Sequence, residues 1–167
     1  MGPVTISPAT AADVGALDAA LRRLSADMGD PHRASQDILA TALSGPDPAC
    51  HALLARPVLA VAGTTDQAIG AALFAPLFST TRGMAGAYVS DLWVAPERRG
   101  TGLGVMLLAA VRDQTARRWG AGFLRLGVYA DNTRARAFYD RLGFRPSADE
   151  TVLTLAGPAL AALKGAP

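Results

Sequence analysis

Cysteine, histidine and lysine are scarce in this chain of 167 residues, and each scarcity excludes a kind of site. Cys50 is the only cysteine, so an internal disulfide and a cysteine-based metal site are both excluded. The two histidines, His32 and His51, lack metal-ligand spacing, and we expect no bound metal. The one lysine, Lys164, follows a leucine, which excludes the Gly-Lys-Ser/Thr sequence of a Walker phosphate loop.

Long apolar runs and a strong charge of one sign are also missing. The longest apolar runs, 51–63 and 68–78, are short and broken by Pro57 and Pro76, so we expect no membrane span. The first residues lack the basic segment and apolar run of a signal peptide. A net charge of +2 is too small to indicate nucleic-acid binding. We therefore expect a cytoplasmic protein with neither a nucleic-acid nor a membrane partner.

The spacing of apolar residues predicts one domain, 1–167, with elements in the order β-α-α-β-β-β-α-β-α-β. Alternating and β-branched stretches predict strands, and apolar residues three and four apart predict helices. The strands are expected over 4–7, 51–63, 67–78, 87–94, 123–130 and 150–157. The helices are expected over 11–27, 34–44, 103 to about 119, and 131–142, with a short helical tail in 158–167.

Glycine occupies every second position where the third of these helices begins, at Gly100, Gly102 and Gly104. Glycine costs conformational entropy there, so its bare backbone must serve a purpose. The start of a helix presents unpaired N–H groups and a positive dipole end, and both attract phosphate. The dinucleotide fingerprint is excluded, because it needs glycines at positions 1, 3 and 6 rather than 1, 3 and 5. The pattern predicts a phosphate-binding loop, with a tight turn that holds no ligand as the alternative.

Two motifs in this order resemble the GNAT superfamily of acetyl-CoA-dependent N-acetyltransferases. Residues 99–104, Arg-Gly-Thr-Gly-Leu-Gly, fit Arg/Gln-x-x-Gly-x-Gly/Ala, and 132–144 fit Asn-x-x-Ala-x-x-x-Tyr-x-x-x-Gly-Phe. The resemblance is strongest over 68–155 and implies the GNAT fold, an α/β (α+β) domain with a central, mixed, mostly antiparallel twisted sheet flanked by helices. Residues 75–104 look most like the diamine and thialysine acetyltransferase branch.

The resemblance implies acetyl-CoA as the acetyl donor and assigns three sets of cofactor-binding residues. A strand end should pair with the pantetheine arm, the glycine loop should hold the pyrophosphate, and one face of the next helix should meet the cofactor. These sets are Leu92, Trp93 and Val94; Arg99, Gly100, Thr101, Gly102, Leu103, Gly104 and Val105; and Asn132, Ala135 and Phe138.

Two residues are expected to carry the chemistry, Tyr139 and Asp91. By resemblance, Tyr139 lies near the sulfur, where a phenol that is protonated at neutral pH can donate a proton to the leaving thiolate; the alternative is a core aromatic. The diamine branch has a glutamate just before its strand aspartate, and this chain has Ser90 there. Because neighbouring strand residues point to opposite faces, Asp91 replaces that acid only if a β-bulge re-aims it. The alternatives are a water chain or Glu150 as the base, with a structural or substrate-orienting role for Asp91.

The sequence therefore predicts an enzyme that moves acetyl from acetyl-CoA to the primary amine of a polyamine or amino-acid-like molecule. The amine attacks directly in a ternary complex, since Cys50 lies in no motif that would make it an acyl carrier. The alternatives are a protein N-terminus or lysine as acceptor, and a non-catalytic acyl-CoA-binding module. Members of the resembling branch are often dimers, so a homodimer is one expected assembly.

Overall fold

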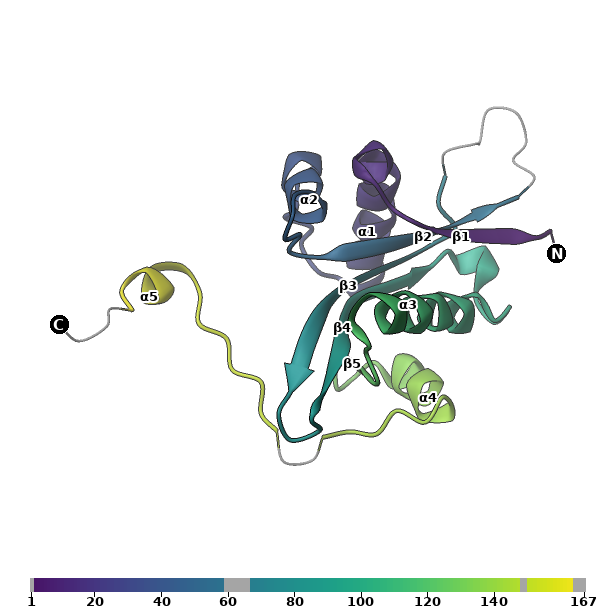
Figure 1. Ribbon diagram of the computed structural model, residues 1–167. Helices are drawn as coiled ribbons and strands as arrows, with labels where there is room; N and C mark the ends of the chain where they lie inside the picture. Colours follow the sequence, from purple (N-terminus) through teal and green to yellow (C-terminus); the bar gives the residue numbers. More distant parts are fainter. Residues whose placement is uncertain (1, 59–66, 148–149, 164–167) are drawn as a thin grey trace. The chain divides into compact units, whose positions relative to one another are not determined.

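A five-stranded mixed sheet, ordered β1-β2-β3-β4-β5, organises the first of two units into which the chain divides, Met1–Gly127 and Val128–Pro167. The computed structural model describes residues 2–58, 67–147 and 150–163 (Figure 1). The first four strands pair antiparallel, and the fifth joins the fourth in parallel. The predicted mixed, mostly antiparallel sheet is thereby confirmed. The strands are β1 (Val4–Pro8), β2 (His51–Pro57), β3 (Gly70–Ser79), β4 (Met84–Val94) and β5 (Leu124–Leu126).

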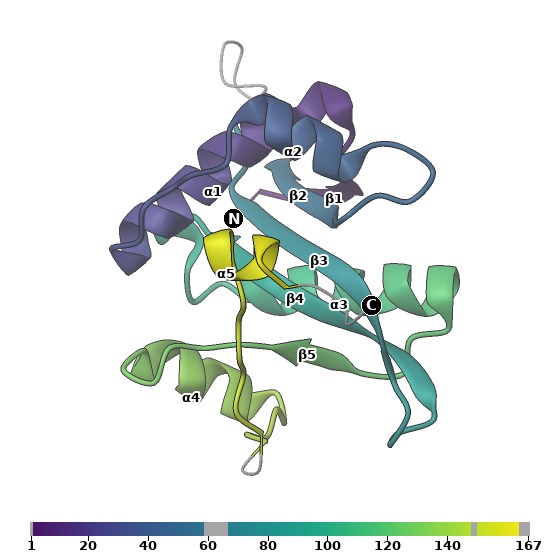
Figure 2. The ribbon, with the colours of Figure 1, turned by 90° about the vertical axis from the view of Figure 1, so that its left-hand side faces the viewer.

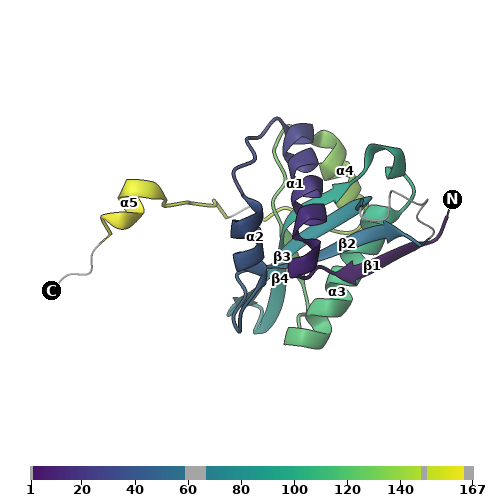
Figure 3. The same ribbon diagram turned by 90° about the horizontal axis from the view of Figure 1, so that it is seen from above.

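Helices cover both faces of this sheet, with α1 and α2 on one face and α3 on the other (Figure 1 and Figure 3). The helices of the first unit are α1 (Val14–Met28), α2 (Gln36–Leu43) and α3 (Leu103–Trp119), with short 3-10 turns η1 (Ala11–Asp13) and η2 (Pro96–Arg98). Leu17 of α1 and Leu107 of α3 are fully buried against the two faces, as their helical spacing predicts. No helix in the described ranges is long and apolar enough to cross a membrane.

The two long strands β3 and β4 form the centre of the sheet (Figure 2). Their apolar positions alternate, so that Phe74 is buried towards α3 while Trp93 is buried towards α1. The predicted strand over 123–130 is shorter in the structure, and only Leu124–Leu126 pair with β4. The predicted strand over 51–63 ends at Pro57, and its last five positions, 59–63, lie outside the described residues.

The second unit contains α4 (Thr133–Arg141) and α5 (Gly157–Ala161). The prediction of a final strand over 150–157 is wrong: these residues have no regular structure before α5 begins. Val152 and Leu153 are 90% and 88% exposed, and no strand of the described chain pairs with them. The alternation that predicted a strand describes only the side chains, whereas a strand also needs a neighbour for its backbone hydrogen bonds. Of the predicted helical tail, 158–161 lie in α5, and 164–167 lie outside the described residues.

A close approach between β4 and the segment before β5 makes one glycine indispensable. A Cβ built on Gly86 would lie 2.5–2.7 Å from ring atoms of Phe123, whereas a Cβ on Gly15 in α1 meets nothing within 4 Å. We predict that Gly86→Ala lowers the free energy of unfolding by about 1–3 kcal/mol through overpacking. Gly15→Ala, the matched control, should raise it by about 0.5–1 kcal/mol, because alanine loses less conformational entropy in a helix. Urea denaturation measures both, and an equal effect of the two variants would contradict this packing account.

Candidate active site

The glycine loop connects β4 to α3 and leaves the first turn of that helix open. Gly100 and Gly102 have φ angles of +76° and +88°, a left-handed conformation that side chains rarely adopt. The first hydrogen bond of α3 runs from the Met106 N–H to the Gly102 carbonyl (3.0 Å), and no side chain caps the helix. The N–H groups of residues 103–105 therefore precede the helix's own hydrogen bonds, at the positive end of its dipole. Two of the three glycines are thus required by the backbone itself.

The Arg99 side chain anchors this loop. Its Nε donates to the Val94 carbonyl (3.0 Å), and its guanidinium forms an ion pair with Asp27 at the end of α1. Asp27 also accepts a hydrogen bond from the Trp93 indole Nε1 (3.2 Å). The Arg99 N–H donates to the Pro96 carbonyl (3.2 Å), so both its side chain and its backbone N–H are engaged within the chain. These contacts of Arg99 fix the loop to the end of β4 and to α1. Because the Arg99 N–H is already paired, the N–H groups that could bind a phosphate begin at Gly100.

The end of β4 has one backbone edge that β5 does not cover. β5 pairs with β4 only from Ala87 to Val89, so within the described ranges no strand follows residues 90–94 on that side. On the other side, Leu92 and Val94 pair with β3 as usual. Trp93 is 2% exposed and points towards α1, which places Leu92 and Val94 on the opposite face. An extended ligand could pair with this edge in the way that a sixth strand would.

A β-bulge at Ser90 sets the direction of Asp91. Phe74 of β3 pairs with Val89 and the preceding Leu73 pairs with Asp91, so Ser90 is the extra residue. Its hydroxyl donates to the Leu73 carbonyl (3.3 Å). Because directly paired residues share a face, the bulge puts Asp91 on the face of Leu73, towards α1, and Val89 on the opposite face. The bulge that the sequence argument required is therefore present.

Burial raises the pKa of the Asp91 carboxyl, although the positive charge of His32 acts in the opposite direction. Burial raises the pKa of the Cys50 thiol, and the negative charge of Asp91 raises it further. Asp91 thus lies half-buried on the α1 face of the sheet, where the charge of His32 and the Cys50 thiol interact with it electrostatically. A carboxylate there is a stronger base than one in water.

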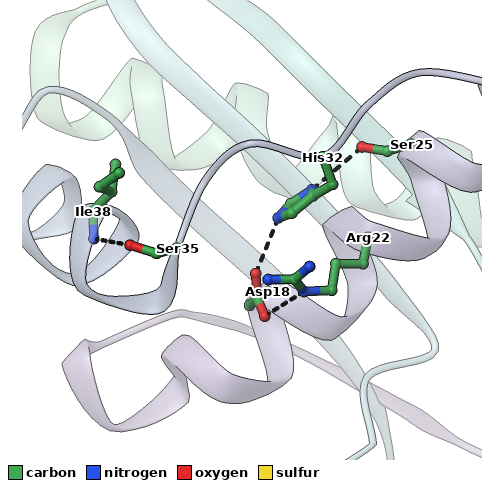
Figure 4. A network of polar contacts seen from close by, with 6 residues as sticks. All are labelled: Asp18, Arg22, Ser25, His32, Ser35 and Ile38. Atoms are coloured by element: carbon green, nitrogen blue, oxygen red, sulfur yellow. Dashed lines mark hydrogen bonds and ion pairs between the residues drawn. The ribbon is translucent and has the colours of Figure 1, made fainter.

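His32, which the sequence argument treated as ordinary, is fixed by a polar network (Figure 4). Asp18 is 4% exposed and accepts hydrogen bonds from the Arg22 Nε (2.8 Å) and the His32 Nε2 (3.0 Å). The Nδ1 of His32 shares a hydrogen bond with the Ser25 hydroxyl (3.3 Å). One signal could have revealed this network: Asp18 follows Val14 by one helical turn, so it is a charged residue on the apolar face of α1.

The remaining predicted site residues lie on one face of α4 in the second unit. Asn132, Ala135, Phe138 and Tyr139 follow the three- and four-residue spacing of a helix face, and all four are half-buried. The Asn132 Oδ1 accepts a hydrogen bond from the Ala135 N–H (3.0 Å) and caps the helix. The Tyr139 ring contacts Phe138 and Phe144, with centroids 5.1 and 5.4 Å away. Burial raises the pKa of the Tyr139 phenol, which keeps it protonated at neutral pH.

The two units carry the predicted residues in separate groups. In the first unit the structure joins Asp91, the uncovered edge of β4 and the glycine loop along one continuous stretch of chain. In the second unit it brings together the four residues on α4. Glu150, the alternative base, is exposed and lies in the irregular segment of the second unit.

A family model described as the acetyltransferase (GNAT) family matches residues 21–144 of this chain. None of the curated proteins matches it. Among solved structures, an integron cassette protein of V. cholerae has a TM-score of 0.74 and 18% identity, covering 95% of each chain. A ribosomal-protein-alanine N-acetyltransferase from Brucella melitensis biovar Abortus 2308 has a TM-score of 0.71 and 21% identity, covering 92% of this chain and 100% of that one. An aminoglycoside acetyltransferase, HMB0005, from an uncultured soil metagenomic sample has a TM-score of 0.72 and 17% identity. The match covers 92% of this chain and 99% of that one.

The Asp18 network predicts how stability depends on pH. Burial raises the pKa of Asp18, but hydrogen bonds from Arg22 and His32 outweigh it, so the net pKa is lowered. A lowered pKa contributes stability above the unfolded value of about 3.9, and this stability is lost as the pH falls through the folded value. We predict that Asp18→Asn lowers the unfolding free energy by about 1–3 kcal/mol at pH 7 and by less at pH 3.

Urea denaturation from pH 3 to pH 7 measures this difference. The control is Asp113→Asn, which alters a carboxylate on the solvent side of α3 that forms an ion pair with its neighbour Arg112. Asp113→Asn should follow the wild-type profile. If Asp18→Asn lowers the free energy of unfolding by the same amount at every pH, the charge of the Asp18 carboxylate contributes nothing to stability.

Proposed function

This chain belongs to the acetyltransferase (GNAT) family, and from that premise we propose that it acetylates the primary amine of a small cationic molecule. The family uses acetyl-CoA as the acyl donor. The observation that carries the proposal is the uncovered edge of β4, which runs from the bulge at Ser90 to Val94 and is connected by the glycine loop to the open first turn of α3. The acetyl donor and the amine acceptor could therefore both bind along β4.

The glycine loop would hold the pyrophosphate of acetyl-CoA. Gly100 and Gly102 are exposed, and a Cβ at either would meet nothing within 4 Å, so a ligand can approach the backbone. The N–H groups of residues 103–105 and the helix dipole supply positive potential. Because Arg99 is held by Val94 and Asp27, the loop needs little rearrangement when the phosphates bind.

The pantetheine arm would pair with the free backbone edge of Leu92–Val94, and the thioester would then lie next to Asp91. N–H groups on that edge would polarise the acetyl carbonyl and stabilise the oxyanion that forms when the amine attacks. The nitrogen forms a bond to the carbonyl carbon, the C–S bond breaks, and the thiolate leaves. Tyr139 would protonate that thiolate, since its raised pKa keeps the phenol in the donor form.

Asp91 would take the proton from the acceptor. An alkylammonium has a pKa near 10.4, so the acceptor arrives charged and must be deprotonated before it attacks. A half-buried carboxylate attracts that cation, and its raised pKa makes it a better base than an exposed one. This favours a polyamine or an amino-acid-like acceptor, in line with the likeness of 75–104 to the diamine and thialysine branch. A cytoplasmic location and a homodimer stay predictions.

Release of CoA from acetyl-CoA, measured against polyamines, amino acids and N-terminal peptides, tests the proposal. We expect turnover with a small amine. Turnover with peptides alone would indicate that the acceptor is a protein and not a small molecule. Binding of acetyl-CoA without any turnover would favour a non-catalytic acyl-CoA-binding module.

The same assay tests the acid. We predict that Tyr139→Phe lowers kcat by a factor of about 10²–10⁴, the usual contribution of general acid catalysis, and leaves the affinity for acetyl-CoA unchanged. Tyr88→Phe, which removes the hydroxyl of an exposed tyrosine on β4, is the control and should retain wild-type kcat. Equal kcat values for Tyr139→Phe and the wild type would show that Tyr139 is not the acid that protonates the thiolate.

A further inference from the structure

A run of large apolar side chains in the second unit is exposed, and the acetyl transfer proposed above uses none of them. Val152 and Leu153 are 90% and 88% exposed, and Leu155, Leu160 and Leu163 are exposed as well. Single exposed apolar residues are normal on a protein surface. A continuous run of them is typical of an interaction surface, because water is an unfavourable environment for so much apolar area.

Local features of the first part of this run, 151–155, favour a β-strand. Its residues are Thr-Val-Leu-Thr-Leu, rich in β-branched side chains, and Gly157 and Pro158 follow as strand breakers. Ala156 already has extended backbone angles, φ −146° and ψ 169°. Because neighbouring strand residues point to opposite faces, Val152 and Leu153 would put apolar side chains on both faces. Such a strand needs a neighbouring backbone, and no strand of the described residues pairs with it.

The outer edge of β5 has the opposite need. The Phe123 carbonyl accepts a hydrogen bond from the Ala87 N–H of β4 (3.0 Å). Backbone groups of successive strand residues point to alternate sides, so Leu124 and Leu126 direct their N–H and C=O groups away from β4. Within the described ranges no strand takes that edge. It is also the edge of β5 that faces away from β4, and so away from the backbone assigned to pantetheine.

The other outer edge of the sheet, on β1, is protected against an added strand. The Ala9 N–H donates to the Ala52 carbonyl of the β2 side (2.9 Å), so the preceding residue, Pro8, is directed to the outer edge. Proline has no N–H to offer there, and natural sheets use it to block pairing at an edge. β5 contains no proline. An added strand therefore fits the edge of β5 better than the edge of β1.

We propose that 151–155 of one copy pairs with the outer edge of β5 in a second copy, and that the exchange is reciprocal. Both halves of the contact lie on this chain, so two copies related by a two-fold axis satisfy both, and each contact forms twice. A protein of another sequence that added a strand to β5 would leave 151–155 exposed. The expected homodimer thereby gains a specific interface, which needs none of the acetyl-transfer chemistry.

Hydrogen exchange of the full-length protein at several concentrations tests this directly, with sedimentation velocity reporting the mass at each concentration. In the dimer we expect the amides of 152–154 and of Leu124 and Leu126 to exchange at least about tenfold more slowly than in the monomer, because they enter a ladder. The amide of Leu54, inside the sheet, is the control and should be protected in both states. Slow exchange of 152–154 in a monomer would show that the segment folds back onto its own chain, and would overturn the proposal.

A charge at the centre of the segment tests the same contact by substitution. Leu153→Glu should raise the dissociation constant of the dimer at least about a hundredfold, because each dimer would bury two carboxylates. Ile38→Glu is the matched control: it places the same charge at an exposed apolar residue on α2, and should dimerise like the wild type. A wild type that is monomeric at every concentration, or a Leu153→Glu variant that dimerises as well as the wild type, overturns the proposal. If Leu153→Glu fails to fold, the exchange measurement on the wild type still decides.

Discussion

The separation of β4 from β5 after Val89 is the constraint on which the account of the site depends. Two strands that stay paired to their ends leave no free backbone edge, whereas here β5 covers only Ala87–Val89. The next residue of β4 is the bulged Ser90, and the strand then continues to Val94 with one edge open. The same strand therefore supplies a redirected carboxyl, a row of free backbone groups and the approach to a helix N-terminus.

Helix α1 supports this arrangement through two aspartates near its middle and its end. Asp18 holds His32, and with it the segment that leads to α2. Asp27 holds Arg99 and Trp93, and with them the glycine loop and the end of β4. Asp18 is buried, so separating its carboxylate from its partners is costly, whereas Asp27 is exposed and acts through two partners, Arg99 and Trp93. Binding of a phosphate to a preformed loop costs less conformational entropy than binding to a loop that becomes ordered only in the complex.

The sequence predicted the features that depend on local residue chemistry. α3 begins at Leu103, directly after Gly102, as the sequence indicated, and the structure adds that Gly100 and Gly102 have left-handed φ angles. The bulge was inferred only as a condition that Asp91 would have to meet, because nothing in the residues around Ser90 specifies which one is unpaired. Its position follows from the register between β3 and β4, a contact between segments that are distant in sequence.

Features that depend on distant partners were missed or wrong. The alternation in 150–157 resembles a strand, yet no strand of the described residues pairs with it. The place of Asp18 on the apolar face of α1 signals a buried carboxylate, but it does not identify His32, fourteen positions later, as the partner.

The central claim is that the open first turn of α3 binds the phosphates of the cofactor. Calorimetric titration of the protein with CoA and, separately, with pantetheine tests it most directly, because pantetheine keeps the thiol arm and lacks every phosphate. The account predicts that CoA binds at least about a hundredfold more tightly, which corresponds to about 2.7 kcal/mol. Equal affinities for the two compounds would contradict it, because the glycine loop would then contribute nothing to binding.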